Sequence, residues 1–258
     1  MSPCRPRHAR SSIPPSAMPT LADRFAQISD RIHASALRSG RSPQDVQLVA
    51  VSKSHPPETL HEAIQAGISV FGENRVQEAR AKIPLLPERA RWHFIGHLQR
   101  NKIRQALPLF DRFHSVDSLE TARDLHRIAA ELGLFPSVLL EVNLAAESTK
   151  FGFPPQSLLD SLDLLLSLDR LQIDGLMCIP PPAPEPEHSR PFFRQLRQLR
   201  DQIQAEAHLP LPQLSMGMSD DFEVAIEEGA TLVRIGTALF GSRSSKTWRP
   251  SSPSGLDD

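Results

Sequence analysis

The sequence contains no tyrosine and only two cysteines among its 258 residues. Cys4 and Cys178 lie far apart in the chain, so they give no disulfide framework and favour a reducing compartment. We therefore expect a cytoplasmic protein. No Cys/His cluster has the spacing of a zinc site, so no metal is expected. The missing tyrosine removes one class of general acid and base from any mechanism.

The chain also lacks an excess of charge of either sign. It has 29 basic and 30 acidic residues, a balance that argues against a general binder of nucleic acid or of membrane surfaces. No apolar run approaches the roughly 18 residues that a membrane span requires. The length of the chain suits one α/β barrel, although it also allows two smaller domains.

Both ends of the chain have compositions that do not build a core. Residues 1–18 contain three arginines, four prolines and several serines but no acidic residue, and we expect a disordered extension. This composition resembles an organellar transit peptide. Its prolines would break an amphipathic helix, however, and Met18 would be a sensible start, so we favour an upstream extension of the reading frame. Residues 244–258 are rich in serine and proline and are expected to form a disordered tail.

Between these ends, residues 19–243 alternate short apolar segments of strand length with amphipathic helices, after one leading helix at Thr20–Leu37. The expected strands are Leu48–Val51, Ile68–Phe71, His93–Ile95, Arg112–Val116, Val138–Val142, Ile173–Ile179, Gln213–Met216 and Leu232–Ile235. The expected helices between them are Glu58–Ala66, Arg75–Ile83, Leu98–Leu107, Leu119–Leu132, Pro155–Leu168, Ser189–Ala207 and Asp220–Glu228. This pattern predicts a single (β/α)8 TIM barrel with an extra N-terminal helix. A doubly wound open sheet is the alternative, but no G-x-G-x-x-G motif follows the first strand.

The first expected strand ends at a lysine. Leu48–Val51 is apolar and partly β-branched, and Ser52 and Lys53 follow it directly. In a TIM barrel the carboxyl ends of the strands form the mouth that carries the chemistry. Desolvation at such an edge lowers the pKa of a lysine and makes the neutral amine available as a nucleophile. Lys53 is therefore a candidate Schiff-base lysine, and the alternative is a solvated lysine that marks the strand end.

Two turns of small residues follow the seventh and eighth expected strands. The first is Ser215–Ser219, which precedes a helix with Ser219 or Asp220 as its N-cap, and the second contains Gly236 and Thr237. TIM barrels commonly hold a phosphate at this pair of loops. Backbone N–H groups near a glycine and neighbouring hydroxyls suit such an anion. The alternative is a pair of ordinary turns with helix caps.

A ligand that has both a phosphate and a carbonyl able to condense with an amine would fit these features, and pyridoxal 5′-phosphate has both. Arg234 lies beside the second turn, where its guanidinium would face the pyridine nitrogen and keep that nitrogen unprotonated. Asn74, after the second strand, is a ligand contact or a helix cap. His97, which follows a glycine after the third strand, is either a ligand contact or structural. Glu141 interrupts an apolar strand and requires a partner if it points inward.

Seven ordered motifs resemble the pyridoxal phosphate homeostasis protein family, whose fold is similar to the N-terminal barrel domain of alanine racemase. The resemblance covers about residues 20–243 and is carried by LVAVSK, FGENRVQE, WHFIGHLQRNK, ESTKFG, IDGLMCIPPP, LSMGMSDDFEVAI and VRIGTALFG.

This resemblance implies a role for each candidate residue. It implies that Lys53 forms an aldimine with pyridoxal phosphate and that Asn74 lines the site. It implies that Arg234 faces the ring nitrogen, and that the phosphate cradle consists of Ser215, Met218, Ser219, Gly236 and Thr237. Arg75 departs from the family, in which a tyrosine often occupies this position. We expect Arg75 to alter the rim of the site or its charge without affecting the lysine.

The resemblance also implies control of the intracellular pyridoxal phosphate pool, without an established catalytic activity. The protein would hold the cofactor on Lys53 and exchange it with other proteins, including pyridoxal phosphate-dependent apo-enzymes. The alternative is a racemase-like amino-acid enzyme. Alanine racemases take their second base, a tyrosine, from a second domain, and this chain has no tyrosine. Such an enzyme would therefore use Lys53 as its sole base. A third reading is an interaction protein that keeps the barrel and no longer uses the cofactor. The lack of a second domain favours a monomer.

Overall fold

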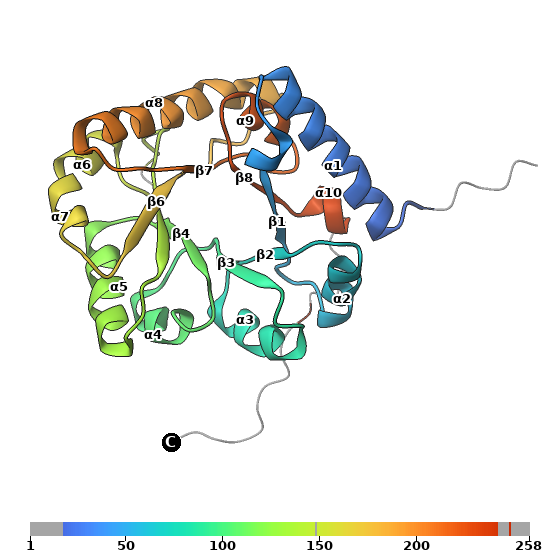
Figure 1. Cartoon of the computed structure of the whole chain (residues 1–258), viewed down its shortest axis with the longest axis horizontal. Coiled ribbons are helices and arrows are strands. Elements are labelled where there is room, and N and C mark those ends of the chain that lie inside the picture. Colours follow the sequence, from blue (N-terminus) through green and yellow to red (C-terminus); the bar gives the residue numbers. More distant parts are fainter. Residues whose placement is uncertain (1–17, 148, 242–247, 249–258) are drawn as a thin grey trace, which may run out of the picture.

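The computed structural model describes residues 18–147, 149–241 and Trp248, and eight parallel strands in these residues close into a barrel (Figure 1). The strands follow one another in sequence order, and β8 pairs with β1 to complete the circle. Their bounds are β1 Gln47–Val51, β2 Val70–Glu73, β3 Arg91–Phe94, β4 Arg112–Val116, β5 Ser137–Glu141, β6 Gln172–Met177, β7 Gln213–Ser215 and β8 Leu232–Ile235. The predicted (β/α)8 barrel is confirmed.

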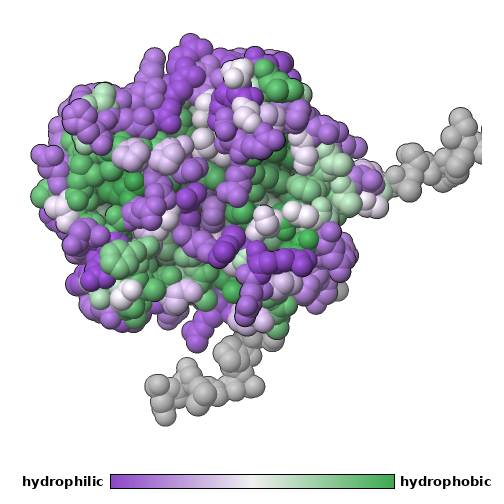
Figure 2. All heavy atoms as spheres, in the orientation of Figure 1, coloured by the Kyte–Doolittle hydropathy of each residue, from purple (hydrophilic) through white to green (hydrophobic). Residues whose placement is uncertain are grey.

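Helices surround the barrel on its outer side (Figure 1). Those in the described residues are α1 Leu21–Arg38, α2 Pro57–Gln65, α3 Val76–Lys82, α4 Ile103–Ala106, α5 Leu119–Leu132, α6 Pro155–Asp160, α7 Leu162–Leu166, α8 Arg190–Ala207, α9 Phe222–Glu227 and α10 Thr237–Phe240. Hydrophilic side chains cover much of this outer ring, and hydrophobic ones gather between the helices on the same face (Figure 2).

The extra N-terminal helix α1 packs beside the closing edge of the barrel. Thr20 caps it with a capping box that includes Asp23, and the chain leaves the helix through Gly40 at φ +70°. Its buried face contacts α9 and α10. Arg31 pairs with Glu223 of α9 at 2.9 Å. The helix therefore covers the two elements that follow the predicted phosphate turns.

Some expected boundaries are wrong, and local side-chain bonds explain one of them. Helix α9 begins after Asp221, so neither Ser219 nor Asp220 is its N-cap. The Asp221 carboxylate accepts the N–H of Met218 at 2.7 Å, and Ser219 Oγ accepts the N–H of Ala238 at 3.3 Å. These side chains stabilise the turn itself rather than the first turn of the helix.

Other elements also differ from the expected ranges, most of them by one or two residues at an end. The helix expected at Leu98–Leu107 is a 3₁₀ turn, Arg100–Lys102, followed by the short α4. The helix expected at Pro155–Leu168 is interrupted at Ser161, which separates α6 from α7. Strand β2 starts two residues later than expected and continues to Glu73.

The expected terminal segments, 1–18 and 244–258, lie outside the described residues except for Met18 and Trp248. In the part of the chain that is described, no helix combines the length and the apolar character needed to cross a membrane.

Candidate cofactor site

A cavity opens where the strands end. Its volume of about 490 Å³ is within the usual range for small-molecule sites. Seven of the eight predicted cofactor-binding residues line it: Lys53, Asn74, Met218, Ser219, Arg234, Gly236 and Thr237. Ser215 does not line this cavity and is fully buried. The barrel thus brings the candidate lysine and both glycine-bearing turns to one space.

The turn that carries Lys53 is held in an unusual backbone conformation. Ser54, the next residue, has φ +68°, which is uncommon for a residue other than glycine. Its N–H donates to the carboxylate of Glu78 in α3. On the other side of Lys53, Ser52 Oγ donates to Glu73 Oε1 at 2.7 Å. Side chains from β2 and α3 therefore fix both neighbours of the lysine.

A buried ammonium connects these contacts. Lys82 is fully buried, and its Nζ donates to the Ser52 carbonyl at 3.0 Å, to Glu73 Oε1 at 2.9 Å and to Glu78 Oε1 at 2.6 Å. Burial raises the pKa of Glu73 to about 7, although the Lys82 charge acts in the opposite direction. Among the residues described, Glu73 Oε2 has no hydrogen-bond partner. We call Glu73, Glu78 and Lys82 the lysine-turn clamp.

Sequence reasoning missed the clamp. Only the i, i+4 spacing of Glu78 and Lys82 signals an ion pair, and nothing in the sequence indicates that it would be buried. The interpretation of Asn74 as a helix cap is wrong. The N-cap of α3 is Arg75, and it makes no side-chain cap bond. Asn74 lies at the cavity instead.

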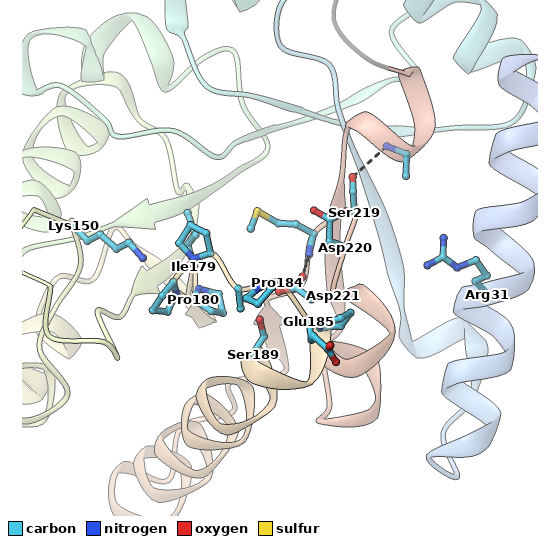
Figure 3. Close-up of a pocket in the computed structure, with 16 residues that line it drawn as sticks. Arg31, Lys150, Ile179, Pro180, Pro184, Glu185, Ser189, Ser219, Asp220 and Asp221 are labelled. Atoms are coloured by element: carbon cyan, nitrogen blue, oxygen red, sulfur yellow. Dashed lines mark hydrogen bonds between the residues drawn. The ribbon is translucent and has the colours of Figure 1, made fainter.

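The two predicted phosphate turns lie side by side. The bond from the Ala238 N–H to Ser219 Oγ connects them directly (Figure 3). Gly217 has φ +89°, and a Cβ there would lie 2.6 Å from Ala225 Cβ. A Cβ on Gly236 would lie 3.3 Å from Val51 Cβ. Glycine at these positions therefore lets the turns pack closely against α9 and β1.

Arg234 is 5% exposed and is held from behind by polar groups inside the barrel. Its Nη1 donates to Ser215 Oγ, and its Nη2 donates to the Cys178 carbonyl at 2.9 Å. Ser215 Oγ in turn lies 2.8 Å from His114 Nδ1, and His114 Nε2 lies 3.0 Å from His93 Nδ1. Ser215 therefore orients Arg234 from beneath the cavity, a contact that strand position alone does not reveal.

Both histidines in this chain of hydrogen bonds are neutral near pH 7. Burial, with a smaller effect of the Arg112 charge, lowers the pKa of His93 to about 3. Burial also lowers the pKa of His114 well below its usual value, assisted by His93 and by Arg234. The charge in this buried chain of hydrogen bonds is therefore carried by the guanidinium of Arg234, which stays protonated at neutral pH.

Glu141 lines the same cavity and is 9% exposed. Burial raises its pKa to about 7, with a further increase from Asp117 and a decrease from Arg234. The Glu141 side chain faces the cavity, which is the inward orientation considered from the sequence. A group that titrates near neutral pH inside a cavity is able to exchange a proton with a ligand there.

The rim of the cavity carries His97 and an apolar ring. His97 Nδ1 lies 2.9 Å from the Asp117 carboxylate, and its imidazole stacks on Phe151 with ring centroids 3.7 Å apart. Phe151, Ile179 and Met218 are exposed hydrophobic residues that line the opening. These side chains make part of the rim apolar.

The model of the family described as "Alanine racemase, N-terminal domain" matches residues 29–244. The pyridoxal phosphate homeostasis protein of Aquifex aeolicus is 44% identical over 222 residues, which cover 86% of this chain and 97% of that protein. The Escherichia coli K12 protein of the same name is 42% identical over 236 residues, which cover 88% and 98%. The chain belongs to the pyridoxal phosphate homeostasis protein family.

Solved structures agree with this membership. PipY of Synechococcus elongatus PCC7942, determined with pyridoxal phosphate bound, is 44% identical with a TM-score of 0.76, covering 86% of this chain and all of PipY. An alanine racemase of Clostridium difficile is 16% identical with a TM-score of 0.67, covering 88% of this chain and 59% of the racemase. The racemase supports the fold alone. The family model extends from within α1 past α10 and so includes every strand that forms the cavity.

Replacing Lys82 with methionine tests the clamp. The change leaves two buried carboxylates without their cation, so we expect the free energy of unfolding to fall by about 3 kcal/mol or more at pH 8. Because the pKa of Glu73 is already about 7, this carboxyl takes up a proton at pH 6, and we expect a smaller loss there. Urea unfolding at both pH values measures the difference.

Arg80→Met is the matched control, because Arg80 is an exposed cation on the same helix. We expect its effect to stay within about 0.5 kcal/mol at both pH values. A loss of stability for Lys82→Met that is no larger than that of the control would contradict the clamp.

Proposed function

We propose that this protein binds pyridoxal 5′-phosphate through a Schiff base on Lys53 and serves intracellular pyridoxal phosphate homeostasis. The observation that carries the proposal is the shared cavity of Lys53, Arg234 and the two phosphate turns. The printed names of the relatives and the cofactor bound to PipY support it.

The residues present fit the three parts of the cofactor. Lys53 supplies a primary amine at the cavity wall. Ser219 and Thr237 supply hydroxyls for a phosphate, and Gly236 permits close approach of the backbone. Arg234 supplies a fixed cation for the pyridine nitrogen. The cavity of about 490 Å³ has room for one such molecule.

Pyridoxal phosphate supplies an aldehyde, and condensation of this aldehyde with the Lys53 amine releases one water. The clamp fixes the backbone on both sides of the lysine, so the amine is presented in a constant position. The Arg234 guanidinium does not give up its proton near pH 7, which leaves the ring nitrogen unprotonated and weakens the ring as an electron sink. The apolar rim slows hydrolysis by restricting water. These features favour retention of the cofactor over turnover of a substrate.

We further propose that pyridoxal phosphate-dependent apo-enzymes are recipients of the cofactor and that the protein works as a monomer. The amine, the hydroxyls and the cation that this proposal assigns to the cofactor are all supplied by described residues of one chain.

Covalent mapping tests the lysine assignment. After loading with pyridoxal phosphate and reduction with borohydride, we expect mass spectrometry to place the added mass on the peptide that contains Lys53. Lys53→Ala should lose the aldimine absorption band, because Lys53 is the lysine that lines this cavity among the described residues. Lys102→Ala, which removes a lysine outside the cofactor cavity, should retain the band. An adduct of the wild-type protein that maps to another lysine would show that the assignment is wrong.

A second candidate function is a racemase-like amino-acid enzyme. It is favoured by the His97–Asp117 pair, which places a further acid–base group at the cavity that Lys53 lines. We expect the carrier function to prevail because the chain has no tyrosine and because Arg234 weakens the electron sink.

Hydrogen exchange separates the two functions. The loaded protein is incubated with a panel of L-amino acids in deuterated water, and exchange at Cα is followed by NMR. We expect exchange no faster than with free pyridoxal phosphate. Faster exchange that is lost in His97→Gln would instead support the enzyme.

A further inference from the structure

A second cavity, of about 350 Å³, lies beside the candidate cofactor site. Its lining includes Arg75, Gln77, Gln99 and Lys102, from the start of α3 and the loop that precedes α4. Asn74, Gly96 and His97 line both cavities. We call this second space the side cavity. It is adjacent to the cofactor site, and the two share one wall.

The charge of the side cavity has one sign. Arg75 and Lys102 line it together with the carboxamides of Asn74, Gln77 and Gln99, and no carboxylate is among its lining residues. Within the part of the chain that the structure describes, neither Arg75 nor Lys102 has a side-chain hydrogen bond or an ion pair. By contrast, the nearby Arg100 and Arg104 pair with Asp124 and Glu131. Two cations without acidic partners in one hollow are complementary to an anion.

The shared wall is a fixed part of the structure. A Cβ on Gly96 would collide with the backbone of Asn74, so these two segments are in direct contact. The His97 ring is held by Asp117 on one side and by Phe151 on another. Asp117 is the acidic group that faces His97, and it does not line the side cavity. A ligand in the side cavity would therefore contact an ordered surface on its cofactor-facing side.

A third cavity does not show this charge pattern. It measures about 760 Å³ and is formed by the Ile179–Pro186 loop, Arg31, Lys150 and the acidic residues near Asp221 (Figure 3). Its two cations are paired, Arg31 with Glu223 and Lys150 with Glu147. Its lining also holds the carboxylates of Glu185, Asp220 and Asp221, so this cavity does not have the purely cationic lining of the side cavity.

We propose that the side cavity binds a small organic anion through Arg75 and Lys102. The ligand carries a phosphate or a carboxylate, which the two cations and the neighbouring carboxamides recognise. Its volume of about 350 Å³ exceeds that of one oxyanion and accommodates an organic body as well. The site is separate from the phosphate turns, and its ligand would lie against the Asn74–His97 wall of the cofactor cavity.

An NMR titration of the full-length, ¹⁵N-labelled protein tests this proposal. Inorganic phosphate and succinate are the two probes, with sodium chloride at matched ionic strength as the blank. The protein is first loaded with pyridoxal phosphate so that the cofactor cavity is filled, and loading is verified by absorbance. Failure to load is therefore recognised before any anion is added, and in that case the titration is performed on the unloaded protein.

We expect saturable shifts of the Gln77, Gln99 and Lys102 amides with at least one probe. The double variant Arg75→Gln, Lys102→Gln should weaken binding roughly tenfold or more. Arg80→Gln, which removes an exposed cation from the same helix outside the cavity, should bind as the wild type does. A response to phosphate alone identifies a phosphate site, and a response to succinate alone identifies a carboxylate site. Shifts no larger than those in chloride, or equal affinity in the double variant, would overturn the proposal.

Discussion

The pairing of the first strand with the last is the constraint on which the candidate site depends. β1 and β8 are in register from Gln47 with Leu232 to Ala50 with Ile235. Lys53 leaves β1 just beyond this pairing, and Gly236 and Thr237 leave β8 beside it. Residues separated by more than 180 positions are thereby brought to one cavity. Glycine is needed at position 236 because a Cβ there would lie 3.3 Å from Val51 Cβ.

Polar groups occupy much of the barrel interior, although buried polar groups are costly unless they find partners. The clamp provides partners for some of them, and a chain of hydrogen bonds that runs from Arg234 through Ser215 and His114 to His93 provides partners for others. Both sets reach residues at the cavity, since one fixes the turn of Lys53 and the other orients Arg234. A barrel filled only with apolar side chains would be able to fold, but it would leave these two groups without fixed positions. We therefore interpret the polar interior as support for the site.

Local signals account for what the sequence predicted well. Helix α5 was expected at Leu119–Leu132, and its bounds are confirmed because Ser118 caps one end and Gly133 adopts a left-handed conformation at the other. The alternation of strands and helices predicted the barrel, and the barrel places strand-end residues such as Lys53 and Thr237 at one mouth. The interruption at Ser161 escaped prediction because the apolar pattern continues across it.

The contacts that sequence reasoning did not find are those between distant residues. Ser215 was assigned to the phosphate cradle from its motif, yet its hydroxyl contacts Arg234 and His114 inside the barrel. Lys82 gave no sign of its role, because its partners Ser52 and Glu73 come from two different strand ends. Such contacts depend on how strands are placed around the barrel, which local periodicity does not encode.

A crystal structure of the protein loaded with pyridoxal phosphate and reduced with borohydride tests the central claim most directly. The account predicts a covalent bond from Lys53 Nζ to the former aldehyde carbon of the cofactor. It also predicts the phosphate beside Ser219, Gly236 and Thr237, and the ring nitrogen facing Arg234. A cofactor attached elsewhere, or a phosphate bound away from these two turns, would contradict it.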